Sequence, residues 1–221
     1  MSPTIFGVLS LGFLLGLKHA FDPDHVVAVS TISSQTRNVR TASFCGISWG
    51  LGHTSTLLLT GFILLFFRLS ISEKLALSFE FLIGLILILL GADSFRNFFL
   101  NKHSHDHAHG AIVHRHAHYH MKERSHDHIH KSFFIGIIHG FAGSAAFMFF
   151  ILSAIGSLPA GLFFILIFGI GSILGMLLIS TIIGLPFLFT RKFTQMNNCV
   201  QIITATCSIF LGFLMVYKIS F

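Results

Sequence analysis

The sequence predicts an all-α membrane protein with six transmembrane helices that form two inverted three-helix repeats. This prediction rests on the composition, on six long apolar runs and on a faint internal repeat. Of the 221 residues, 53% are apolar and only 10% are charged, whereas soluble domains carry about 25% charged residues. So few polar residues cannot cover a surface in water. We therefore expect lipid around most of the chain.

Six apolar runs are long enough to cross a bilayer, which takes about 20 residues of α-helix. They are Ile5–Ile32, Phe44–Phe67, Leu75–Ala92, Ser132–Ile155, Gly161–Phe189 and Val200–Tyr217. An open strand would leave its backbone groups unsatisfied in lipid, so each run should be helical. The first run has no basic segment before it and no small-x-small site after its apolar core. We expect it to be a membrane span and not a cleaved signal peptide.

Basic residues in the loops predict the orientation of these spans. One side holds Arg68, Lys74 and Lys218, and the other holds Arg37, Arg40, Arg96, Lys102, Arg115, Lys122, Arg124, Lys131, Arg191 and Lys192. Loops rich in Lys and Arg stay in the cytoplasm. We therefore expect a multi-pass plasma-membrane protein with both termini outside and the 101–131 loop inside. Trp49 and Tyr217 fit the aromatic belts at the two membrane interfaces.

The two halves of the chain share a weak similarity. Residues 16–19 (Gly-Leu-Lys-His) resemble residues 136–139 (Gly-Ile-Ile-His), and residues 49–53 (Trp-Gly-Leu-Gly-His) resemble residues 168–172 (Phe-Gly-Ile-Gly-Ser). Because each half holds three spans, the second half would be inverted in the bilayer. Inverted repeats with a site between them are typical of transporters. The alternative is a six-helix bundle that reuses small residues wherever helices touch.

A histidine-rich stretch separates the halves. The predicted organisation is a first half over 1–100 with the H-x4-D-H motif, a cytoplasmic loop over 101–131 and a second half over 132–221. The loop carries His103, His105, His107, His109, His114, His116, His118, His120, His126, His128 and His130. We expect this polar tract to be disordered without metal. Its spacing is mainly i,i+2, which favours many weak metal sites over one closed zinc site. A pH-responsive linker is the alternative.

The first apolar run carries charged residues in its middle. A charged side chain at the bilayer centre costs about 2.5–3.5 kcal/mol, so Asp22 and Asp24 should be paired, hydrated or bound to a ligand. At 100° per residue, His19, Asp22 and His25 share one helical face, whereas Asp24 points about 100° away from His25. Pro23 disfavours a continuous helix. We expect a break there that turns Asp24 toward the same cavity and frees the His19 carbonyl.

Imidazole and carboxylate groups together suit a borderline divalent metal such as Ni²⁺, Co²⁺ or Zn²⁺. A proton relay or a structural pair between helices is the alternative. Two further spans contain His53 and His139, each beside glycines that allow another helix to approach closely. A lone buried histidine is usually a satisfied core residue, but beside this cluster we expect both to be ligands. The candidate metal site is His19, Asp22, Asp24, His25, His53 and His139.

These residues carry a resemblance to a known family. Residues 19–25 resemble the H-x4-D-H signature of the nickel/cobalt transporter family, and residues 51–56 (Leu-Gly-His-Thr-Ser-Thr) are similar to its second signature. Residues 139–146 resemble a segment of its short, urease-accessory-type relatives. Larger members have more spans and an Asp-Asn pair where this chain has Ser30-Thr31, which favours the short branch.

The resemblance implies a divalent metal permease. His19, Asp24 and His25 would act in transport, with Asp22 nearby and His53 in the second motif. It also implies a nickel chaperone, or urease or hydrogenase maturation factors, as partners.

The leading hypothesis is a secondary transporter that moves Ni²⁺ or Co²⁺ inward, with Zn²⁺ as a further substrate. It predicts no permanent cofactor and no nucleic-acid partner. The sequence has no P-loop motif, so we do not expect this chain to hydrolyse ATP. The alternatives are an exporter with the same fold, a membrane enzyme with a histidine-bound metal, and a metal sensor. All four histidines outside the loop lie within spans, which suits permeation better than catalysis.

Overall fold

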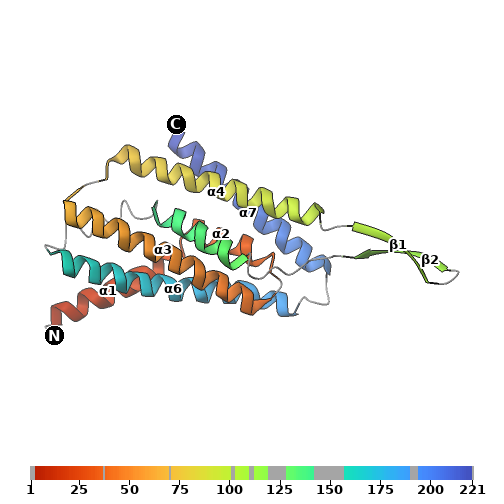
Figure 1. The fold of residues 1–221 in the computed structure, drawn as a ribbon, viewed down its shortest axis with the longest axis horizontal. Helices are drawn as coiled ribbons and strands as arrows, with labels where there is room; N and C mark the ends of the chain where they lie inside the picture. Colours follow the sequence, from red (N-terminus) through yellow and green to blue (C-terminus); the bar gives the residue numbers. More distant parts are fainter. Residues whose placement is uncertain are drawn as a thin grey trace.

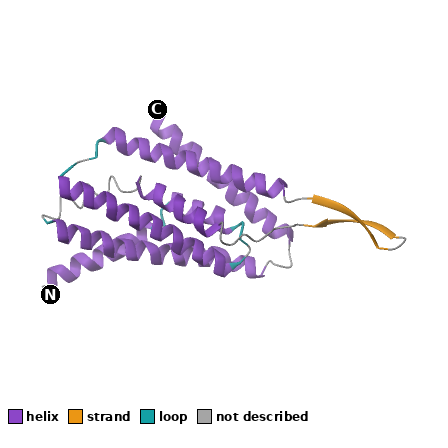
Figure 2. Ribbon diagram, in the orientation of Figure 1, coloured by secondary structure: helices purple, strands orange, loops and turns teal. Residues whose placement is uncertain are grey.

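The computed structural model describes residues 3–36, 38–69, 71–100, 103–109, 112–118, 128–141, 157–189 and 194–220. The helices are α1 (Pro3–His19), α2 (Pro23–Ser33), α3 (Val39–Phe67), α4 (Glu73–Leu100), α6 (Leu158–Phe189) and α7 (Thr194–Ser220). Residues 128–141 are also helical. The strands β1 (His103–His109) and β2 (Ile112–His118) form a hairpin that projects from one end of the helices (Figure 2). Outside this hairpin, the described elements are helical, as predicted.

By length and composition, four of the described helices could cross a membrane. They are Val39–Phe67, Glu73–Leu100, Leu158–Leu185 and Asn198–Ser220. The first predicted span is built differently, because α1 ends at His19 and α2 begins at Pro23. Asp22 has extended backbone angles, φ −62° and ψ 143°, as favoured for a residue before proline. The break expected at Pro23 is therefore present. The fourth predicted span lies partly outside the described residues.

Among helices α1–α4, α6 and α7, the most extensive contacts are those of α3 with α6 and of α4 with α7, and α1 packs along α6 (Figure 1). Helix α2 contacts α3, α4, α6 and α7. It therefore lies where the two pairs meet, and His25 in its first turn is buried. The start of α1 and the end of α7 lie toward the end of the bundle that is opposite the hairpin (Figure 1).

The histidine-rich loop contains regular structure. Strands β1 and β2 pair antiparallel, with His103 opposite His118, His105 opposite His116 and His107 opposite His114. The expectation of a disordered tract is wrong for these residues. Histidines that alternate with other residues match the two-residue period of a strand. Polarity alone does not reveal this alternation. Residues 119–127 of the loop lie outside the described part of the chain.

Candidate metal centre

The break between α1 and α2 positions the first half of the site. The amide of Phe21 donates to the carbonyl of Lys18 (2.9 Å), and the amide of Asp22 donates to the carbonyl of His19 (3.0 Å). The His19 carbonyl is therefore occupied, and the expectation that it would be free is wrong, because the turn after α1 uses it. Helix α2 starts with the amide of Val26 donating to the Asp22 carbonyl (3.0 Å).

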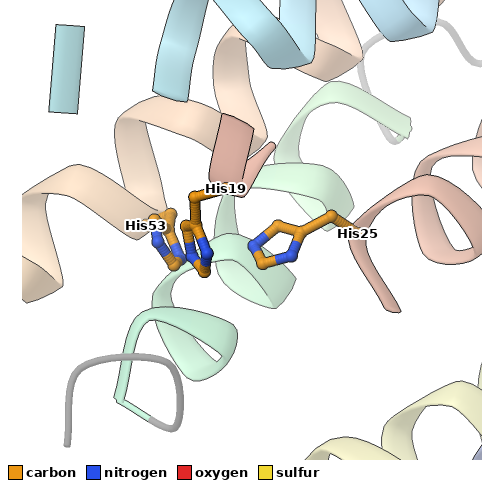
Figure 3. Close-up of side chains that lie close together, drawn as sticks. All are labelled: His19, His25 and His53. Atoms are coloured by element: carbon orange, nitrogen blue, oxygen red, sulfur yellow. The ribbon is translucent and has the colours of Figure 1, made fainter. Parts of the chain in front are cut away.

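Four histidines converge at this break. The ring centroid of His25 lies 4.6 Å from that of His19, 5.3 Å from that of His53 and 4.2 Å from that of His139. Figure 3 shows the His19 and His53 rings beside each other, with the His25 ring reaching toward them from α2. The rings come from α1, α2, α3 and the helical segment 128–141. Sequence positions more than 100 residues apart thus supply one cluster.

The donor atoms form two groups of three that share His25, and each group is compact enough to hold an ion. Those of His19, His25 and His53 lie within 4.8 Å of one another, and so do those of Asp24, His25 and His139. Asp24 accepts hydrogen bonds from Nε2 of His139 (2.8 Å) and from Nδ1 of His25 (3.3 Å). The helix break therefore turns Asp24 into the cluster, as expected from Pro23. Five of the six predicted site residues meet in this cluster.

Asp22, the sixth, stands at its edge. It is half-exposed and accepts a hydrogen bond from Nδ1 of His19 at 2.7 Å. Because a carboxylate accepts, the Nδ1 atom of His19 carries the proton, and its Nε2 atom presents a lone pair. A carboxylate behind a histidine ligand fixes the ring and raises its basicity. The geometry gives Asp22 a positioning contact with His19.

Several buried nitrogen atoms of the cluster have no hydrogen-bond partner. The side chains of His25, His53 and His139 are at most 1% exposed. Among the described residues, nothing pairs with Nε2 of His25 or with either ring nitrogen of His53. An unsatisfied buried polar atom costs about 1–3 kcal/mol. Such atoms gathered at one point suit a cation that prefers nitrogen ligands.

Two aromatic side chains that the sequence analysis did not place here line the cluster. The ring centroid of Trp49 lies 5.5 Å from that of His139, and Phe168 lies 5.4 Å from His19. Trp49 is fully buried, so its expected place in an interfacial belt is wrong. The rule that places aromatic residues at membrane interfaces uses the depth of a residue in its span. The burial of Trp49 depends instead on which face of the helix carries it. The one available signal was that Trp49 and Phe168 are matched in the internal repeat.

The donor set excludes some metals and favours others. Mg²⁺ and Ca²⁺ bind mainly oxygen ligands, whereas imidazole with a carboxylate suits Ni²⁺, Co²⁺, Cu²⁺ and Zn²⁺. The family model for the high-affinity nickel-transport protein, NicO, matches residues 5–217. This chain belongs to the NicO family. The match spans both halves, so the predicted family is confirmed.

A curated relative supports the short branch of the family. The urease accessory protein UreH of Bacillus sp. (strain TB-90) is 39% identical over 215 residues, which cover 97% of this chain and 92% of the relative. No solved structure matches the chain significantly. As a NicO protein with long apolar helices, the chain is a multi-pass membrane transporter for nickel and not an enzyme.

Proposed function

We propose that this NicO transporter is a secondary permease that brings Ni²⁺ into the cytoplasm. The ligands are His19, Asp24, His25, His53 and His139, and Asp22 orients His19. The observation that carries the proposal is the buried cluster of imidazoles around Asp24, with ring nitrogens left unpaired. One carboxylate offsets part of the charge of a divalent ion, and neutral imidazoles complete its shell without holding it as tightly as thiolates would. Co²⁺ and Zn²⁺ fit the same donors and compete with Ni²⁺.

Reciprocal contacts support two inverted halves. A Cβ on Gly16 would overlap the main chain of Phe168, and a Cβ on Gly136 would overlap the main chain of Trp49. Gly16 and Gly136 are matched in the repeat, as are Phe168 and Trp49. The contact of α1 with α6 is thus repeated by the contact of segment 128–141 with α3. The ring contacts show the same correspondence between the halves, because His19 contacts Phe168 and His139 contacts Trp49.

The remaining helix pair shows the same reciprocity. A Cβ on Gly84 would meet the side chain of Val216, and a Cβ on Gly212 would meet the side chain of Ile88. Val216 lies four residues after Gly212, just as Ile88 lies four residues after Gly84. An axis that exchanges α4 with α7 produces this pattern. We therefore propose six spans, of which α1 and α2 together form the first, in halves 1–100 and 132–221.

The orientation follows from the charges. The basic residues gather on the side of the 101–131 loop, and the start of α1 and the end of α7 lie away from the hairpin. We place the hairpin in the cytoplasm and both termini outside the plasma membrane. We propose delivery of the ion to urease or hydrogenase maturation factors, or to a nickel chaperone, and the name of the urease accessory relative supports the link to urease.

The proposed function predicts nickel flux by the purified protein alone. Proteoliposomes loaded with a nickel indicator should take up Ni²⁺ down its gradient faster than empty vesicles, without ATP. Vesicles with an imposed potential, negative inside or positive inside, show which direction is driven. Net flux that requires an added ATPase subunit would contradict a secondary permease, and flux only out of the cytoplasmic side would favour an exporter.

The hairpin should concentrate metal without forming the pathway. Replacing residues 103–118 with a Gly-Ser linker of equal length should lower the number of Ni²⁺ ions bound, because seven histidines are lost. It should leave the flux within about twofold, because the hairpin projects away from the helices that hold the cluster. Equilibrium dialysis and vesicle flux measure the two quantities. Loss of flux from a protein that still inserts and melts normally would refute this division.

A further inference from the structure

We infer that Ser172 supplies a neutral oxygen to the permeating ion, from the second half and at the position equivalent to His53. This inference rests on the proposed function and adds a ligand to its site. Ser172 is fully buried, and among the described residues its hydroxyl has no hydrogen-bond partner. Another buried serine on the same helix, Ser180, does have a partner, because its hydroxyl donates to the Met176 carbonyl at 2.6 Å.

The contacts of α6 show where Ser172 points. A Cβ on Gly175 would meet Ala20 at the end of α1, and a Cβ on Gly169 would meet Thr54 of α3. At 100° per residue, Ser172 lies about 60° from Gly175 and about 60° from Gly169, on the arc between them. Its side chain therefore faces the space between α1 and α3. That space holds His19 and His53.

His53 has the same relation to its own helix. A Cβ on Gly50 would meet Ile173 of α6, and a Cβ on Gly140 of segment 128–141 would meet Thr56. His53 lies about 60° from each of these two faces. Gly50, His53 and Thr56 each match a residue of α6 119 positions later, and the match of His53 is Ser172. Because the imidazole of His53 faces the cluster, its counterpart faces the cluster from the opposite helix.

Phe168 places Ser172 beside the ligands. It lies one helical turn before Ser172, hence on nearly the same face, and its ring centroid is 5.4 Å from that of His19. On α3, Trp49 precedes His53 by one turn and contacts His139 in the same way. The second half therefore repeats the wall of the site but replaces an imidazole with a hydroxyl. A weak neutral donor at one position keeps the ion exchangeable, which permeation requires.

Cysteine substitution tests the position of this oxygen directly. In the purified full-length chain, Ni²⁺ added to Ser172→Cys should produce a thiolate-to-nickel charge-transfer band in the near ultraviolet, because thiolates bind such metals strongly. The difference spectrum against the wild-type protein removes the contribution of its three native cysteines. The matched control, Ser180→Cys on the same helix, should give no band, since its side chain lies two turns away.

Removal of the hydroxyl gives a second, independent readout. In proteoliposomes, Ser172→Ala should raise the Ni²⁺ concentration for half-maximal flux by about threefold to tenfold. A change of this size corresponds to the loss of one contact that is about as strong as a hydrogen bond. Ser180→Ala should leave it unchanged. A Ser172→Cys protein without the band, together with wild-type flux in Ser172→Ala, would overturn the inference while leaving the histidine site intact. Wild-type protein that binds no Ni²⁺ at the cluster would overturn both proposals.

Discussion

The His19→Ala/His25→Ala variant should bind Ni²⁺ at least about 10³-fold more weakly than the parent and should show no flux above empty vesicles. Even groups behind a metal ligand change affinity by about 10–100-fold, and this variant removes two of the proposed direct ligands. The two rings lie 4.6 Å apart at the centre of the cluster. When both are removed, no other described imidazole can supply the two missing nitrogen donors. Equilibrium binding should be measured with the hairpin replaced, so that its histidines do not mask the loss.

Controls separate ligation from folding. His130→Ala removes an exposed histidine outside the cluster and should leave affinity and flux unchanged. Asp24→Asn keeps the shape of the side chain but removes its charge, so it should weaken binding without impairing insertion. Parent-like affinity in the double histidine variant would show that the first motif is structural.

Gly16→Ala should destabilise the transporter by about 1–3 kcal/mol, as overpacked cores do, and should abolish flux. The added methyl group would overlap the carbonyl of Phe168, and a main-chain group cannot move unless α1 separates from α6. Since α1 ends at His19, this separation would also pull a proposed ligand out of the cluster. The free energy of unfolding in detergent and the vesicle flux measure the two effects.

A matched control lies on the same helix. An added methyl group on Gly7 meets nothing within 4 Å, so Gly7→Ala should be neutral or slightly stabilising, because alanine is the better helix former. Gly136→Ala should repeat the effect of Gly16→Ala if the halves are related as proposed. A Gly16→Ala protein that melts and transports like the wild type would show that the packing between α1 and α6 can adjust to the added methyl group.

The clustering of the candidate ligands could be predicted because lipid makes unpaired polar groups costly. Asp24 had to find a partner inside the span, and Pro23 had to break the helix beside it. Both arguments use local chemistry, and the structure has the break and the pairing. The inclusion of His53 and His139 needed one further assumption, that rare histidines within spans gather together.

The features that the sequence did not predict depend on which helices contact each other. Trp49 was assigned to an interface because its depth in the span is readable from the sequence, whereas the face it presents is set by packing against a distant segment. Ser172 carries no signal of its own, because a serine in a transmembrane helix usually bonds to its own backbone. Its match with His53 in the weak internal repeat and the contacts around Gly169 and Gly175 together distinguish it. The hairpin was missed because polarity was weighed above the alternation of its histidines.

The divided first span also has an electrical consequence. In the proposed first span, helices α1 and α2 have 17 and 11 residues, so the break would lie well inside the hydrocarbon, about 25 Å along the chain from the start of α1. A divalent ion that reaches it from outside has crossed roughly half of the transmembrane voltage. At 100 mV, negative inside, that displacement is worth about 2.3 kcal/mol for two charges. The resting membrane would therefore fill the site from outside about fifty times more readily than a depolarised one.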